Sequence, residues 1–442
     1  MKNIRSRSLK EILKIRNEKI NPCLSVSYDQ PLKIVKGRGV WLYDDKGIKY
    51  LDMVNNVSHV GHCHPKVTQA AIEQMQQLNT NSRYLHDNLA EYSVKLLDTF
   101  PKELSVIFLC CTGSEANELA LRLASAKTSG DQIITVDGAY HGNTQKLIDI
   151  SPYKHNSKGG NGAPDYVQVV PIPDEYRGRL SNKKHVINAG YEYAQFLDKA
   201  IENIHGNGKI LSAFICESLL GCGGQMPLPE GYLAEAYQKV HAAGGVCIAD
   251  EVQVGFGRCG THMWSFEKQN VVPDIVTLGK PIGNGHPLAA VVTTREIADA
   301  FNNGMEYFNT FSANPVSCAI GLSVLEVIED ENLQKNALTI GNYMIQELRK
   351  IKPHCHYMGD VRGTGFYIGV EFVIDKKSKV PAADIVDNVV QLLRDKKILL
   401  STDGPDHNVL KIKPPMVFNK THADLFLSSL VDSLKELDYW IE

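Results

Sequence analysis

The sequence contains no apolar run long enough to cross a membrane and no strong excess of charge of either sign. Its longest apolar stretches have only the length of β-strands, whereas a membrane-spanning helix needs about 20 apolar residues. The formal net charge is −3, and 22% of the residues are charged. A near-neutral chain of this kind offers no support for nucleic-acid binding. We therefore expect neither a membrane nor a nucleic acid as a partner.

The ten cysteines include no Cys-x-x-Cys pair, and no secretory apolar segment stands at the N-terminus. This usage is typical of reduced thiols in the cytosol rather than of disulfides. The neighbouring His62, Cys63 and His64 do not predict a metal site, because adjacent residues cannot easily surround one ion and no second ligand cluster follows at zinc-finger spacing. A loop that leads to Pro65 at the first turn of a helix is the preferred interpretation. We expect no metal.

Residues 1–20 are rich in Lys and Arg and carry apolar residues that could line one face of a helix. A mitochondrial transit peptide is one interpretation of such a segment. Its glutamates, Glu11 and Glu18, and its few serines favour an amphipathic arm of the mature protein instead. The cytoplasm is therefore the expected compartment, with the mitochondrial matrix as the alternative.

A chain of 442 residues can bury a large core and is expected to form two domains. Strand-sized apolar runs alternate with helical segments, which predicts an α/β fold with a doubly wound, mostly parallel sheet. Beyond about residue 325, two long helical segments flank a strand-like run, which favours a smaller α+β domain. The predicted strands are 104–111, 132–136, 209–216, 246–249, 275–278, 288–292 and the later run 359–372. The expected division is an N-terminal arm with part of the small domain (1–59), a large domain (60–325) and a C-terminal small domain (326–442).

Lys280 follows one of the predicted buried strands directly and is followed by two turn-forming glycines. A lysine at the carboxyl end of a strand lies where open α/β sheets bind ligands. If it is desolvated it loses its proton easily and can form a Schiff base with an aldehyde. For an isolated Gly-Lys pair, a surface lysine beside a turn is the simpler account. Asp250 favours the ligand-binding account of Lys280, because it ends the preceding apolar run, 246–249, in the same way. An aspartate beside the ring nitrogen of pyridoxal phosphate (PLP) keeps that nitrogen protonated, so the pair predicts a PLP site.

Three further candidates stand at strand ends. Ser114, in the turn Thr-Gly-Ser that opens a helix, could contribute to a phosphate-binding helix N-terminus or could simply cap that helix. Tyr140 could stack on a flat ring or belong to the core. Glu217 ends the strand before that of Asp250. Because the ends of parallel strands meet at one edge of a sheet, we expect Ser114, Tyr140, Glu217, Asp250 and Lys280 to converge there.

The stretch 248–258, Ile-Ala-Asp-Glu-Val-Gln-Val-Gly-Phe-Gly-Arg, followed by 274–285, resembles the signature of the class III (ornithine/GABA-type) PLP-dependent aminotransferases. The resemblance extends over nearly the whole chain and implies the fold type I architecture. It implies that Lys280 binds the cofactor covalently and that Asp250 faces the pyridine nitrogen. The other implied cofactor contacts are Gly113 and Ser114 at the phosphate, Tyr140 and Val252 on the two ring faces, Gln253 near the phenolic oxygen, and His141 and Glu217.

The same family is built on dimers with shared active sites. Thr310 resembles the threonine that reaches the cofactor phosphate of the neighbouring subunit. We therefore expect a homodimer, with a tetramer as the alternative.

Two positions depart from the family pattern. Many relatives carry an arginine that binds the substrate α-carboxylate where this chain has Lys411, and lysine lacks the planar fork of arginine. Several carry a glutamate that pairs with that arginine where this chain has Cys222. These departures put ordinary α-keto-acid transamination in doubt. Segments such as 55–64, 79–87 and 409–416 are similar instead to phospho-lyases that act on phosphoethanolamine or on 5-phosphohydroxylysine.

The expected function is accordingly elimination of phosphate from an O-phosphorylated amine such as phosphoethanolamine, which gives acetaldehyde, ammonia and phosphate. A substrate without a carboxylate has no use for an arginine fork, but its phosphate needs cationic partners. Arg83 and Lys411 are the candidates. The alternatives are an ω-aminotransferase, a 5-phosphohydroxylysine phospho-lyase, and a PLP-binding protein without turnover.

Overall fold

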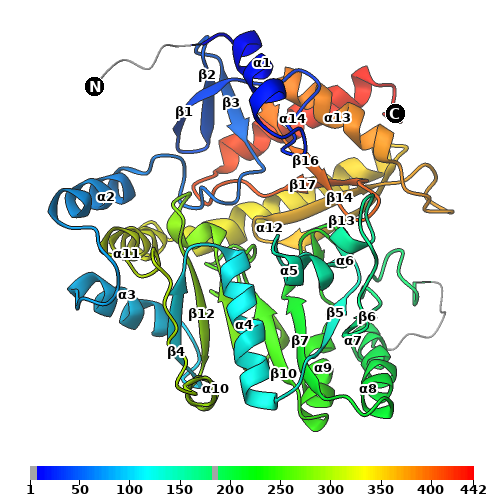
Figure 1. Cartoon of the computed structure of the whole chain (residues 1–442). Coiled ribbons are helices and arrows are strands. Elements are labelled where there is room, and N and C mark those ends of the chain that lie inside the picture. Colours follow the sequence, from blue (N-terminus) through cyan, green and yellow to red (C-terminus); the bar gives the residue numbers. More distant parts are fainter. Residues whose placement is uncertain (1–6, 182–187) are drawn as a thin grey trace.

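The computed structural model describes residues 7–181 and 188–442 (Figure 1). Residues 1–6 of the predicted N-terminal arm lie outside this range. The rest of the arm forms helix α1 (Leu9–Lys19), which begins after Ser8. The Ser8 hydroxyl accepts a hydrogen bond from the backbone of Glu11, and the Glu11 carboxylate accepts one from the backbone of Ser8. This reciprocal cap satisfies two N–H groups that a helix end leaves unpaired. The helix was predicted, but it buries none of its side chains.

A seven-stranded sheet forms the centre of the molecule. Its order is β4-β12-β11-β10-β7-β5-β6, and every pairing is parallel except those of β12 with its two neighbours. The predicted α/β fold with a mostly parallel sheet is thus confirmed. The strands are β4 (Leu104–Cys110), β5 (Gln132–Val136), β6 (Val167–Val170), β7 (Leu211–Glu217), β10 (Val246–Asp250), β11 (Ile275–Leu278) and β12 (Ala289–Thr294).

Helices cover both faces of this sheet, so its strands are apolar throughout. Successive side chains of one strand enter different cores. Ile248 packs with helix α4 (Gly113–Thr128), whereas its neighbour Cys247 packs with helices α8 (Phe196–Gly206) and α9 (Tyr232–Ala242). The other helices around the sheet are α2 (Pro65–Gln77), α3 (Asp87–Leu97), α5 (Gln145–Asp149), α6 (Pro152–His155), α7 (Ala189–Ala194), α10 (Arg295–Phe301) and α11 (Pro315–Asp330).

Two four-stranded sheets form the other half of the molecule, and one of them joins the N-terminal and C-terminal parts of the chain. One has the order β13-β14-β17-β16, with β13 (Met358–Thr364), β14 (Tyr367–Phe372), β16 (Ser401–Asp403) and β17 (Val409–Ile412). The other joins β1 (Ile34–Arg38), β2 (Trp41–Asp44) and β3 (Lys49–Asp52) to β15 (Ile398–Leu399), which pairs in parallel with β3. Helices α12 (Leu333–Ile351), α13 (Ala383–Asp395) and α14 (Lys420–Glu436) pack in this half.

The predicted strand-like run 359–372 is a hairpin of β13 and β14 rather than one strand. Gly365 turns the chain with φ 53°, and a Cβ there would come within 2.3 Å of the Arg258 carbonyl oxygen. Only glycine fits such a close approach. The turn was missed because Gly359, Gly363 and Gly369 also occur in this run, so that Gly365 did not stand out as the turn residue.

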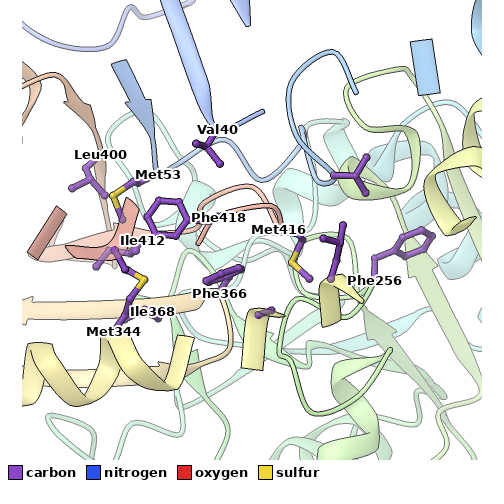
Figure 2. Packing of buried hydrophobic residues seen from close by; sticks show 14 of the residues in the cluster. Val40, Met53, Phe256, Met344, Phe366, Ile368, Leu400, Ile412, Met416 and Phe418 are labelled. Atoms are coloured by element: carbon purple, nitrogen blue, oxygen red, sulfur yellow. The ribbon is translucent and has the colours of Figure 1, made fainter. Parts of the chain in front are cut away.

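One hydrophobic core connects these sheets to the central one (Figure 2). Val40, between β1 and β2, and Met53, directly after β3, meet Phe418 from the C-terminal part, and the same cluster extends to Phe256 beyond β10. It fixes β17 beside the carboxyl edge of the central sheet.

The domain boundaries near residues 60 and 325 remain a proposal. Within the described part of the chain, no helix is both long and apolar enough to cross a membrane.

Candidate active site

A cavity of about 220 Å³ opens at the carboxyl ends of the central parallel strands. Its lining includes every residue expected to touch the cofactor except Thr310. The lining residues are Thr112, Gly113, Ser114, Asn117, Tyr140, His141, Gly142, Glu217, Asp250, Val252, Gln253 and Lys280. A larger hollow of about 750 Å³ between α3, α11 and α12 contains none of these residues, so the smaller cavity is the candidate active site.

Lys280 brings its amine into this cavity directly after β11. It begins a short 3₁₀ helix (η2, Lys280–Gly283) with φ 35°, in the left-handed region that non-glycine residues rarely occupy. Such strain costs on the order of 1–3 kcal/mol and is concentrated at functional sites. Burial lowers the pKa of the Lys280 amine, and the nearby Asp250 carboxylate partly opposes this shift. A lowered pKa favours the neutral, nucleophilic amine.

Asp250 lies at the end of β10, where three donors hold its carboxylate. Asn117 Nδ2 donates to Oδ2 at 2.9 Å, His141 Nδ1 lies 2.8 Å from the same oxygen, and the Val252 N–H donates to Oδ1 at 3.1 Å. His141 is itself held by Thr135, whose Oγ1 lies 3.4 Å from its Nε2. The carboxylate is 3% exposed. A buried carboxylate fixed in this way can meet a protonated ring nitrogen without reorganisation.

The N-terminus of α4 provides a site for an anion. Thr112 caps the helix, so the interpretation of Ser114 as the cap is wrong; the Thr112 hydroxyl accepts from the Glu115 N–H at 3.1 Å. The N–H groups of Gly113 and Ser114 have no acceptor within residues 7–181 and 188–442. Free N–H groups at a helix N-terminus attract phosphate. The space at this helix N-terminus is also narrow, because a Cβ on Gly113 would lie 2.9 Å from the Val252 side chain.

Glu217 stands beside Asp250 at the end of the neighbouring strand. Its carboxylate accepts hydrogen bonds from the N–H groups of Tyr140 at 3.4 Å and Gly221 at 3.0 Å. Burial, followed by the charge of Asp250, raises the pKa of Glu217 to about 7. The group can therefore exchange a proton near neutral pH. Tyr140, which also lines the cavity, lies in the loop after β5.

Three predicted residues lie outside the cavity wall of this chain. Arg83 is exposed and pairs with Glu306 at 3.0 and 3.2 Å, with its guanidinium 3.9 Å from the centre of the Phe308 ring. Thr310 is exposed in the loop after α10. Lys411 lies on β17, where its amine is 3.1 Å from Asp403 Oδ2. It is close enough to contribute to the lowered pKa of Lys280. The roles proposed for all three stay predictions.

Sequence reasoning missed Asn117, Asn56 and Lys413 as members of the site. Asn117 follows Gly113 by one helical turn, and that spacing could have indicated a side chain on the same face of α4. Lys413 follows Lys411 by two residues, which places both on one face of an extended strand. Asn56 gave no such signal, because its partner Gln253 is 197 residues away in the sequence.

Comparison with known proteins agrees with this geometry. The family model for aminotransferase class-III matches residues 23–434. A Drosophila melanogaster protein named alanine–glyoxylate aminotransferase 2-like is 49% identical over 94% of this chain and 85% of its own length. A Caenorhabditis elegans protein named ethanolamine-phosphate phospho-lyase homolog 1 is 38% identical over 94% of this chain and 91% of its own. The structure of an Arthrobacter phospholyase in complex with phosphoethanolamine superimposes with a TM-score of 0.91 and 39% identity, covering 96% of this chain and 99% of that one.

The chain belongs to the class-III aminotransferases, a family of PLP-dependent enzymes with the fold type I architecture. The residues present fit that cofactor. Free N–H groups suit its phosphate, a buried carboxylate suits its ring nitrogen, and a desolvated amine suits its aldehyde. Both aminotransferases and phospho-lyases occur among the relatives, so family membership alone leaves the reaction open.

Proposed function

We propose that this protein is a PLP-dependent phospho-lyase that eliminates phosphate from an O-phosphorylated primary amine, with phosphoethanolamine as the substrate. The observation that carries the proposal is the amine of Lys411, held by Asp403 beside the cavity, with Cys222 as its uncharged neighbour. Burial opposes the charged form of Lys411, but the carboxylate of Asp403 outweighs it and raises the pKa of Lys411. A single ammonium group suits a phosphate, whereas a carboxylate is better matched by the fork of arginine.

The residues of the cavity support a short reaction sequence. Lys280 would hold the cofactor through its amine, and when that amine is free it would remove the proton from the substrate α-carbon as a general base. When bound, PLP supplies an electron sink for the pair that this proton leaves behind. The C–O bond at the β-carbon then breaks, and phosphate departs with the bonding electrons. Addition of water to the two-carbon fragment gives acetaldehyde and ammonia, so the sum is phosphoethanolamine and water to acetaldehyde, ammonia and phosphate.

Phosphate release in the absence of any keto acid tests this proposal. The PLP-loaded protein is expected to release phosphate, acetaldehyde and ammonia from phosphoethanolamine in equal amounts and over many turnovers. A lyase does not transfer the amino group to a keto acid, so added pyruvate or glyoxylate should not accelerate the reaction. Phosphate and acetaldehyde are measured with and without each keto acid.

Two other outcomes would replace the proposal. Turnover that requires a keto acid and converts the cofactor to its amino form would identify an ω-aminotransferase, which the name of the Drosophila relative favours. Phosphate release from 5-phosphohydroxylysine alone would retain the elimination chemistry and change the substrate. Both compounds are therefore assayed side by side.

Lys411 is expected to bind the substrate phosphate. Replacing Lys411 by methionine keeps most of its volume but removes the charge, and should raise the KM for phosphoethanolamine about tenfold or more, as expected for a hydrogen bond to a charged group. Lys420→Ala is the control, because Lys420 is exposed on α14 and its partners, Asp424 and Tyr343, do not line the cavity. An unchanged KM in Lys411→Met would show that Lys411 does not bind the phosphate. The same assay applied to Arg83→Ala decides the second candidate.

A homodimer with shared active sites is the proposed assembly. Exposed apolar side chains gather on segments 79–86 and 302–311, which also carry Arg83 and Thr310; Tyr84 is 68%, Met305 69% and Phe311 74% exposed. Burying such a surface against a second copy would bring Thr310 toward the partner's cofactor phosphate. We propose the cytoplasm as the compartment, with the mitochondrial matrix as the alternative, since three relatives are named mitochondrial.

Phe311→Asp is expected to convert the dimer to monomers, because an unpaired charge in an apolar interface is costly. Light scattering after size-exclusion chromatography measures the mass. Leu425→Asp is the matched control, since Leu425 is an exposed apolar residue on α14, away from both segments. A monomeric wild-type protein would contradict the proposed assembly, and a tetramer would extend it.

A further inference from the structure

Lys413 is a buried lysine that the proposed reaction does not use. It follows β17, is 0% exposed, and has no carboxylate within ion-pairing distance in the described part of the chain. Its amine donates to Gln253 Oε1 at 3.0 Å and lies 4.2 Å from the centre of the Tyr367 ring. Burial and the neighbouring Lys411 lower the pKa of Lys413 well below its usual range. A buried amine of this kind is costly to retain, and its partner Gln253 indicates its role.

The Gln253 side-chain oxygen, Oε1, accepts hydrogen bonds from two donors. Besides Lys413, Asn56 Nδ2 donates to Gln253 Oε1 at 3.3 Å. The donors come from opposite ends of the chain and use the same oxygen, so they distinguish the two ends of the amide. A carboxamide is nearly symmetrical in shape, and its orientation depends on such partners. With Oε1 engaged, Nε2 is the end left for other contacts.

Gln253 contributes to the wall of the active-site cavity. None of the described residues accepts a hydrogen bond from Nε2. The amide therefore offers a free N–H donor to whatever occupies the cavity. If it rotated by half a turn, it would offer an acceptor oxygen instead.

We propose that Lys413 is a positioning residue that, together with Asn56, locks the Gln253 carboxamide so that Nε2 donates a hydrogen bond to the bound cofactor. The proposal assumes that PLP binds in this cavity but does not depend on the reaction, because elimination and transamination would need the same orientation. The surroundings suit a neutral donor. Asp403 is already engaged by Lys411 and by Gln225, and Glu217 accepts from two N–H groups.

The absorption spectrum of the bound cofactor tests this role without any substrate. The ratio of its two long-wavelength bands depends on whether a donor or an acceptor faces the ring oxygen. In Lys413→Met the amide loses its main restraint, and the band ratio at one fixed pH is expected to change about fivefold, the effect of one net hydrogen bond. Lys413→Gln, which can still donate through its amide, should restore most of the wild-type ratio.

A double-mutant cycle separates positioning from a direct effect of the lysine. If Lys413 acts through Gln253, Lys413→Met will change the band ratio in the wild type but not further in Gln253→Ala. An equal change in both backgrounds, or no change in either, would overturn the proposal. Thermal unfolding monitors the fold of each variant. If Lys413→Met does not fold, Asn56→Ala, which removes the other donor, answers the same question in the same cycle.

The spectral test can contradict the role of Lys413 without contradicting the proposed function, and the phosphate assay can do the opposite. A protein that releases no phosphate but shows the coupled spectral change would keep Lys413 as a positioning residue and lose the lyase assignment. A protein that releases phosphate with a band ratio unaffected by Lys413→Met would do the reverse.

Discussion

Lys280→Ala is expected to reduce phosphate release about 10⁴-fold or more, because one residue supplies both the amine that binds the cofactor and the base that removes the α-proton. The Lys280 amine is prepared for both tasks by burial, which lowers its pKa. Initial rates of phosphate release at saturating phosphoethanolamine measure the loss. Treatment of the wild type with borohydride should attach the cofactor to the peptide that contains Lys280, and the variant should remain unlabelled.

The control for this experiment is Lys102→Ala. Lys102 is exposed in the turn before β4 and has no contact with the cavity, so this variant should keep the wild-type rate and the covalent label. A Lys280→Ala protein that retains its fold and still releases phosphate within tenfold of the wild-type rate would show that another group does the chemistry.

Asp250→Asn has the second largest expected effect, about 10²- to 10³-fold on kcat, comparable to removing one preorganised electrostatic partner from an active site. The side chain keeps its shape but loses its charge, so it no longer holds the cofactor ring nitrogen in the protonated form. Because Asn117 and His141 support Asp250 from behind, the loss should appear in kcat more than in KM. Steady-state kinetics with phosphoethanolamine separate the two constants.

Asp274→Asn is a matched control for this prediction. Asp274 also pairs with a histidine, His241, at 2.7 Å, but it lies at the opposite end of β11 from Lys280. Removing its charge should leave kcat unchanged. If Asp250→Asn were as active as Asp274→Asn, the carboxylate would have no part in stabilising the reaction.

The sequence was most informative where one strand end determined the position of one residue. Lys280 and Asp250 could be placed because an apolar run stops at each, and parallel strands bring such ends together. The central fold followed from the alternation of the same runs with helices. Contacts that depend on the folded chain could not be found in this way. Lys413 meets Gln253 across 160 residues of sequence, and no local pattern indicates that pair.

Arg83 and Thr310 show a different limit. Thr310 was selected by resemblance and Arg83 as a cation for the substrate phosphate, and both lie on exposed loops away from the cavity of their own chain. A motif identifies a residue type at a position, but in the proposed dimer the site to which that residue contributes would depend on which surfaces of the two copies meet. That information is distributed over the exposed apolar side chains of segments 79–86 and 302–311.

The pairing of β3 with β15 has a consequence for how the protein is made. The hydroxyl of Tyr28 donates to the carbonyl of Leu400, which is 372 residues later in the chain, and β15 completes the sheet begun by β1 to β3. At ribosomal rates of about 5–20 residues per second, the N-terminal strands wait on the order of half a minute for their partner to be synthesised. Residues 28–52 are therefore among the last parts of the chain to reach their final structure, and chaperones have a long opportunity to bind there.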